Sequence, residues 1–199
     1  FNVMTPDMEI ITPIRDQRLS REEEVEYLKS HGIDKDWKKA KYSINQGLWG
    51  TSVGGAETLT SHKNLPEEAW PIPAQNLEPK IIELNFKRGE PVGIDGDEMD
   101  PISTIKRLEE LAAPYGIGRD IHIGDTIIGI KGRVGFEAAA PLIIIEAHRL
   151  LEKHVLGKWQ LYWKDQLGDF YGMLMHEGQF LDPVMRDIES FLAHTQQKV

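Results

Sequence analysis

Residues 116–137, GIGRDIHIGDTIIGIKGRVGFE, constrain the fold more than any other part of this chain. The stretch places six glycines among short runs of β-branched apolar residues, a pattern typical of short strands joined by tight turns. Because glycine has no Cβ, such a backbone can approach a small ligand closely. We therefore expect two strands joined by an Asp-Thr turn, with residues 129–135 exposed as a ligand-binding loop. An ordinary glycine-rich hairpin that binds nothing is the alternative.

The rest of the chain alternates between short strands and longer helices. Residues 82–87 alternate apolar with polar side chains, which predicts a strand with one buried face. A turn at residues 88–91 then returns the chain into a hairpin partner at residues 92–94. Capping residues and apolar stripes predict helices over residues 21–32, 101–115, 138–154 and 183–192, and one helix or a pair of helices over residues 158–177.

Strands followed by segregated helices predict an α+β fold rather than repeated βαβ units. We expect a mixed or largely antiparallel sheet flanked by helices. Residues 47–55 carry four glycines and are expected to be irregular, with Trp49 acting as a packing residue. Residues 8–11 are expected to end a strand, and residues 34–41 to form a charged connector.

Composition argues against several classes of partner. The formal net charge of −9 disfavours nucleic acid or an anionic membrane as the main partner, because both require clustered cations. The sequence has no cysteine, which excludes disulfides and thiolate zinc sites. It has neither an HExxH pattern nor an apolar run approaching the roughly 20 residues that span a bilayer. We expect no metal site and a cytoplasmic location.

Several segments, in the same order, carry a resemblance to a known family. The pattern Gly116-x-Gly118-Arg119, then Gly129-x-Lys131-x-Arg133, then Glu137 resembles a signature block in the synthetase domain of the argininosuccinate synthase family. Residues 42–52, YSINQGLWGTS, resemble a second block of that family. Further colinear matches are residues 11–16, 91–96 and 147–148, so the likeness covers most of the 199 residues.

The resemblance implies a domain organisation. Residues 1–36 would be the end of a nucleotide-binding domain with its linker, and residues 37–199 a synthetase domain for citrulline binding and oligomerisation. The family's Ser-Gly-Gly-x-Asp-Ser pyrophosphate loop does not occur in this sequence. Such loops bind phosphate through backbone N–H groups. We therefore expect a fragment that is short at both ends and inactive as a ligase by itself.

The resemblance also implies a reaction and its participants. Members join citrulline and aspartate, cleaving ATP to AMP and pyrophosphate, in arginine biosynthesis. ATP would be held mainly by the absent nucleotide-binding domain, and Mg²⁺ would arrive with the ATP. The full-length protein is expected to be a cytoplasmic homotetramer. The aromatic residues expected to contribute to its subunit contacts are Trp159, Tyr162, Trp163, Phe170 and Phe191.

Four positions correspond to the family's citrulline-binding residues; two keep the family's residue and two depart from it. Ser43 and Ser52 correspond to serines that contact citrulline, and a hydroxyl can both donate and accept hydrogen bonds. Gly124 stands where many members have a citrulline-binding glutamate, and Phe136 stands where they have a tyrosine. These two departures remove a partner for the substrate's ammonium group and a hydroxyl. An unpaired buried charge is costly, so either another group replaces the glutamate and citrulline is bound through rearranged contacts, or the substrate differs.

Three carboxylates are open candidates for that replacement: Asp120, Asp125 and Glu137. Lys131 and Arg133 are expected to steer anionic substrate or phosphate toward the site, because cations attract both groups. Two alternatives to the synthase remain at this point. One is a non-catalytic, ligase-derived binding or oligomerisation module, and the other is an adenylating ligase for a different amino acid.

Overall fold

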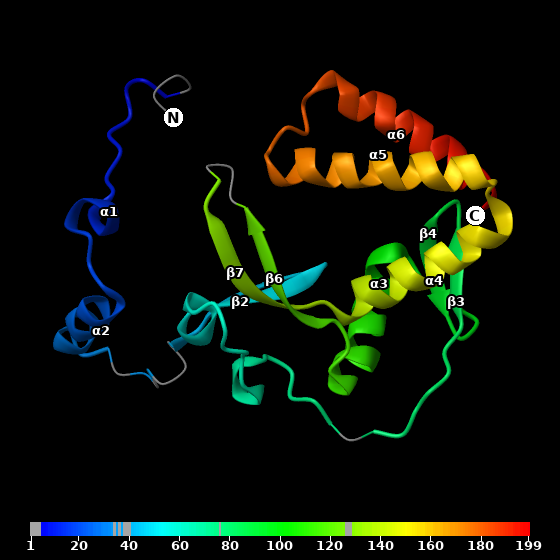
Figure 1. Cartoon of the computed structure of the whole chain (residues 1–199). Helices are drawn as coiled ribbons and strands as arrows, with labels where there is room; N and C mark the ends of the chain where they lie inside the picture. The colour runs from blue at the N-terminus through cyan, green and yellow to red at the C-terminus, as the bar shows by residue number, and fades with distance from the viewer. Residues whose placement is uncertain (1–4, 34, 36, 38–40, 76, 126–128) are drawn as a thin grey trace. The chain divides into compact units, whose positions relative to one another are not determined.

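The computed structural model describes residues 5–33, 35, 37, 41–75, 77–125 and 129–199. The chain divides into two compact units, Phe1–Lys41 and Tyr42–Val199. The second unit contains both sheets and the longer helices (Figure 1). The predicted α+β class is confirmed, since helices accompany sheets that are antiparallel throughout.

The first unit holds two helices, α1 (Pro13–Gln17) and α2 (Arg21–Ser30). The predicted capping box is present: the Glu23 amide donates to the Ser20 hydroxyl at 3.2 Å, and the Ser20 amide donates to the Glu23 carboxylate at 2.7 Å. The expected strand at residues 8–11 was wrong, because these residues pair with no strand. Of the expected connector, residues 34, 36 and 38–40 lie outside the described residues.

The larger of the two sheets in the second unit has four strands. Its order is β1 (Ser43–Gly47), β2 (Gly50–Gly54), β7 (Lys131–Glu137) and β6 (Arg119–Asp125), and every pair is antiparallel. The hairpin of β6 and β7 is visible in Figure 1. Two expectations were therefore wrong: residues 47–55 are not irregular, because 50–54 form a strand, and within the expected loop at 129–135, residues 131–135 form a strand.

Both expectations took the glycines as a sign of loop structure, whereas in the sheet they allow close packing of neighbouring groups. A Cβ on Gly135 would collide with the Leu65 side chain, so this position admits a large apolar side chain directly against the strand. Gly50 has a φ of +136° and begins β2 at the hairpin turn, a conformation that favours glycine. Trp49, expected to pack inside, lies in that turn and is exposed.

A second, smaller sheet consists of β3 (Leu84–Lys87), β4 (Glu90–Ile94) and β5 (Asp97–Glu98). The predicted hairpin is confirmed, with a register shift between Asn85 and Phe86. The helices of this unit follow the predicted ranges closely: α3 (Pro101–Ala112), α4 (Ala139–Val155), α5 (Lys158–His176) and α6 (Pro183–Thr195). Short 3₁₀ turns are η2 (Ala56–Leu59), η3 (Glu67–Ala69), η4 (Ala113–Tyr115) and η5 (Gln196–Lys198).

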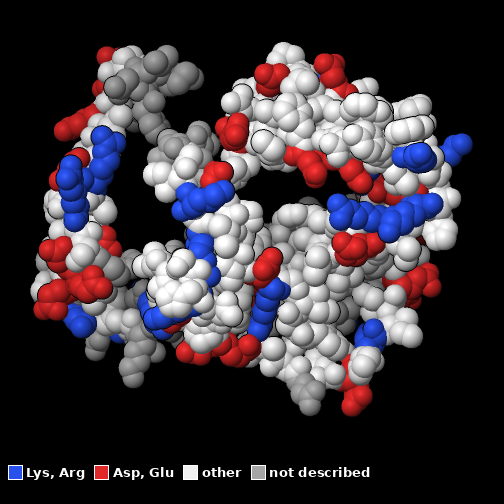
Figure 2. Space-filling view, in the orientation of Figure 1, with Lys and Arg blue, Asp and Glu red and all other residues white. Residues whose placement is uncertain are grey.

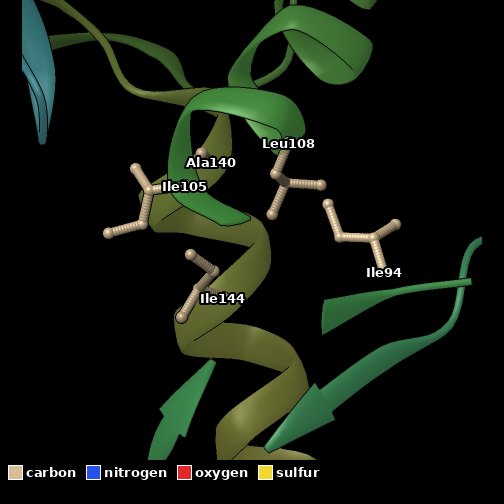
Figure 3. Packing of buried hydrophobic residues seen from close by; sticks show 5 residues of the cluster. All are labelled: Ile94, Ile105, Leu108, Ala140 and Ile144. Atoms are coloured by element: carbon tan, nitrogen blue, oxygen red, sulfur yellow. The ribbon is translucent and has the colours of Figure 1, made fainter. Parts of the chain in front are cut away.

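The largest apolar core lies where the small sheet meets α3 and α4. Ile94 comes from β4, Ile105 and Leu108 come from α3, and Ala140 and Ile144 come from α4 (Figure 3). Burial of these side chains supplies the main hydrophobic stabilisation of the region. This core fixes the start of α4, which follows β7 after a single residue, and so anchors one end of the large sheet.

A buried polar network joins α4, α5 and η5. The Glu152 carboxylate is almost fully buried; it accepts from Lys164 Nζ at 2.7 Å and from Gln196 Nε2 at 2.7 Å. His148 Nε2 lies 2.9 Å from Gln196 Oε1. Burial of the ring lowers the pKa of His148, and the charge of Glu152 only partly offsets that effect. The network ties the α5–α6 pair to the core through charged groups.

The α5–α6 pair leaves many large side chains uncovered. The two helices pack along each other, yet no residue of α5 is fully buried within this chain. The exposed aromatic residues include all five of the predicted set: Trp159, Tyr162, Trp163, Phe170 and Phe191. In the part of the chain that the structure describes, no helix has the length and apolar character needed to cross a membrane.

Candidate functional site

The large sheet has one open face, and its side chains form a cross-strand row. Asn45 lies opposite Ser52, Ser52 lies opposite Phe136, and Phe136 lies opposite Asp120. Residues paired across antiparallel strands project to the same face, so these four side chains are neighbours in one line. Asn45, Phe136 and Asp120 are exposed and Ser52 is half-buried. The row is a shallow surface of hydroxyl, amide, carboxylate and aromatic groups.

Three further positions extend this open face by the two-residue repeat of a strand. Ser43 precedes Asn45 by two residues on β1, while His122 and Gly124 follow Asp120 on β6. The imidazole of His122 lies against Gly124: a Cβ built on Gly124 would be 2.6 Å from His122 Nε2. A side chain at position 124 would therefore displace the ring. The His122 imidazole occupies the space into which a longer residue at position 124 would extend.

Phe136 depends on a second glycine for its position. A Cβ on Gly50 would lie 3.0 Å from Phe136 Cε1 and 3.0 Å from the Cβ of Ala138. Since Gly50 also has a positive φ, any other residue there would both strain the turn and push against the phenyl ring. The β1–β2 hairpin thus supports the aromatic group at the centre of the row.

The opposite face of the sheet is covered where Arg119 and Glu137 lie, and there it holds an ion-pair network. Arg119 Nε donates to Glu137 Oε1 at 2.8 Å, and its Nη1 donates to both Glu67 oxygens at 2.9 and 3.0 Å. Its Nη2 donates to the Ile72 carbonyl, and the guanidinium lies 5.2 Å from the centre of the Trp70 ring. Burial disfavours the charged guanidinium, but the bonds to Glu137 and Glu67 outweigh it and raise the pKa of Arg119.

Apart from Asp120, the remaining charged residues of β6 and β7 also lie on this second face. The guanidinium of Arg133 donates to the carbonyls of Thr60 and Lys63, and so fastens residues 56–65 against the sheet. Asp125 and Lys131 are opposite each other at the far end of the hairpin and form an exposed ion pair of 2.8 Å. Exposed pairs of this kind contribute little to stability.

Strand alternation therefore divides the sequence-predicted site residues into two sets. The open face carries Ser43, Ser52, Gly124 and Phe136, whereas the second face carries Asp125, Lys131, Arg133 and Glu137. The contacts of Glu137 and Arg133 are with groups of the chain itself. They favour a structural role for both residues over the ammonium-binding and anion-steering roles predicted for them.

The sequence predicted no function for Asn45 and His122, which share the open face with the predicted serines. A partial signal for His122 exists in the sequence: residues 121–123 read Ile-His-Ile, and in the structure Asp120 and His122 flank Ile121, which packs inward. No such signal marks Asn45, because all five residues of β1 are exposed.

Charge is distributed without a single dominant patch on the surface in view. Figure 2 shows Lys and Arg side chains interspersed with Asp and Glu side chains. Among the described residues, no group of three or more His, Asp or Glu side chains is arranged to hold a metal ion. The chemistry that the open face offers is hydrogen bonding to a small polar ligand, with one carboxylate, one imidazole and one aromatic ring.

Comparison with known proteins gives this architecture a family. Residues 42–199 match the family model described as Arginosuccinate synthase C-terminal domain. The match begins at the residue where the second compact unit begins. Because the model covers most of the 199 residues, the chain belongs to the argininosuccinate synthase family.

Individual relatives agree with that assignment. The chain is 38% identical over 202 residues to the argininosuccinate synthase of Methanocaldococcus jannaschii, a match that covers 100% of this chain and 51% of the relative. It is 39% identical to that of Dictyoglomus turgidum (98% of this chain, 50% of the relative) and 35% identical to that of Rubrobacter xylanophilus (98% and 49%). The chain spans about half the length of the curated relatives it matches.

Proposed function

We propose that this chain is the citrulline-binding synthetase portion of an argininosuccinate synthase. One observation carries the proposal: within the region that matches the family model, Ser43 and Ser52 occupy one open sheet face together with Phe136 and Gly124. Neutral hydroxyls suit a neutral ureido group, which both donates and accepts hydrogen bonds. In this assignment the serines contact citrulline, while Phe136 and Gly124 shape the surface beside it.

The proposed reaction proceeds in two steps. The ureido oxygen of citrulline attacks the α-phosphorus of ATP and pyrophosphate leaves; the amine of aspartate then attacks the ureido carbon and AMP leaves. Catalysis of this kind depends on alignment of the reactants and on stabilisation of phosphoryl charge. The sheet face contributes alignment by holding citrulline, and a nucleotide-binding half contributes the phosphate contacts together with ATP and its Mg²⁺.

The proposal extends to the setting of the enzyme. Residues 37–199 would act as the synthetase and oligomerisation domain, and residues 1–36 as the end of the nucleotide-binding domain with its linker. The exposed aromatic residues of α5 and α6 would be covered in a cytoplasmic homotetramer, since soluble oligomers bury such patches against their own copies. Lys131, beside the exposed end of β7, remains a predicted contributor to anion steering.

Pyrophosphate release tests the reaction directly. In the complete synthase that carries this chain, release should require ATP, citrulline and aspartate together, and the 199 residues alone should release none. Ser52→Ala should raise the KM for citrulline about tenfold, because it removes a hydrogen bond to substrate. Ser190→Ala on α6 is the matched control and should change nothing. A complete enzyme that shows no citrulline-dependent release would refute the proposed activity.

A further inference from the structure

The open sheet face contains a single carboxylate. The four strands carry three acidic residues, Asp120, Asp125 and Glu137. Asp125 and Glu137 project to the second face, where they pair with Lys131 and Arg119 at 2.8 Å each. Asp120 alone projects to the open face, because it lies directly opposite Phe136.

The side chain of Asp120 is exposed and held in place locally. Its Oδ1 accepts a hydrogen bond from the Ile121 amide at 2.7 Å, which orients the carboxylate. Ile121 itself packs into the apolar core under the sheet, beside Val53 and Leu65. The core therefore fixes the backbone from which Asp120 projects.

No cation of the same strands competes for this carboxylate. The basic residues Arg119, Lys131 and Arg133 all occupy the second face by strand alternation. On the open face the nearest titratable neighbour along β6 is His122, two residues further on. A carboxylate in this setting is available to an external positive charge, and a charge-assisted hydrogen bond to an ammonium group is stronger than one between neutral groups.

The distance from Asp120 to the serine is suitable for an amino acid with two polar ends. Ser52 and Asp120 are separated by two strand spacings, which amounts to about 10 Å between backbones. Phe136 lies between them and offers an apolar surface to the methylene groups that join the two ends. One end of such a ligand would reach the hydroxyl while the other reached the carboxylate.

We propose that Asp120 binds the α-ammonium group of the amino-acid substrate on the open face of the sheet. This inference rests on the proposed function, which supplies citrulline as the amino acid. It assigns Asp120, in preference to Asp125 or Glu137, as the carboxylate that takes the place of the glutamate missing at Gly124. Asp120 thereby becomes a residue that determines specificity for a free α-amino group.

The test combines two variants with two ligands in the complete synthase. Asp120→Asn keeps the size of the side chain and its acceptor oxygen but removes the charge. It should raise the KM for citrulline about tenfold and leave the KM for ATP unchanged. Asp97→Asn, on the exposed strand β5 of the small sheet, is the matched control and should leave both values unchanged. Circular dichroism of the variants checks that each is folded.

The second ligand isolates the ammonium group. 5-Ureidopentanoate is citrulline without its α-amino group, and its inhibition constant against citrulline should be the same in the wild type and in Asp120→Asn. If Asp120→Asn weakens both ligands equally, or leaves the citrulline KM unchanged, the assignment of Asp120 is wrong while the proposed reaction stands. If the wild-type enzyme does not use citrulline, the proposed function fails and this inference fails with it.

Discussion

Arg119 and Glu137 face each other across the β6–β7 pair and form a 2.8 Å ion pair in which only 11% and 2% of their side chains are exposed. The sequence offers Glu137 as a candidate for binding substrate, yet its carboxylate accepts a hydrogen bond from Arg119 inside the protein. The same arginine also binds Glu67 and the Ile72 carbonyl. The pair thus joins the sheet to residues 67–72, which cover its buried face.

Replacing Arg119 should destabilise the protein strongly. Arg119→Met leaves Glu137 buried without its cation, and breaking a buried pair in this way typically costs about 3 kcal/mol or more. The free energy of unfolding, measured with urea at neutral pH, should fall by that amount. Arg107→Met on the exposed side of α3 is the control, and its effect should stay below about 0.5 kcal/mol. Equal effects of the two variants would contradict a stabilising role for the network.

The network around Glu152 should behave similarly. Lys164→Met removes the cation that lies 2.7 Å from this buried carboxylate, so we expect a loss of about 3 kcal/mol in the free energy of unfolding. Adding Glu152→Gln to that variant should restore part of the loss, because the charge that needed a partner is gone. Lys153→Met, at an exposed position of α4, serves as the control. A double variant less stable than Lys164→Met alone would argue against this explanation.

His148 should remain neutral to lower pH than an ordinary histidine. Burial of its ring lowers the pKa of His148 from 6.5. Below pH 6.5 the unfolded chain then binds a proton more readily than the folded chain, so stability falls as the pH drops from 6.5 through the folded-state pKa. An NMR titration of the imidazole resonances should give a pKa below 6.5. A value above 6.5 would mean that Glu152 dominates over burial.

The aromatic surface of α5 should mediate self-association. Trp159 and Trp163 are 66% and 54% exposed in the single chain, and uncovered side chains of this size favour contact with another copy. Light scattering on the complete synthase should show an oligomer, and Trp163→Ser should shift it toward smaller species. Gln166→Ser, on the same helix, is the control. A wild-type monomer at tens of micromolar would remove the basis for this prediction.

The helices were predictable because their signals are local. Asp100 and Asp182 each precede a proline and accept hydrogen bonds from the first turn of α3 and α6, as the sequence indicated. The small hairpin was predictable from the alternation of Leu84 and Phe86 with polar residues. In each case the residues that specify the element lie within it or directly before it.

The β1–β2 hairpin was not predictable in the same way. β1 is exposed along its whole length, so no buried face produces a two-residue pattern. Its glycines indicate a turn when considered alone, whereas the role of Gly50 depends on Phe136 and Ala138, which are distant in sequence. Prediction of the site was limited in the same way by contacts between residues distant in sequence. The sequence could name three candidate carboxylates, but only the strand register separates Asp120 from Asp125 and Glu137.

The alternation along β6 also has an evolutionary consequence. Arg119 and Ile121 contact the interior, so substitutions there should impair folding whatever the substrate is. Asp120 and His122 touch no core and can change with little risk to the fold. A lineage could therefore acquire a new ligand preference through substitutions at Asp120 and His122, while Arg119 and Ile121 preserve the fold.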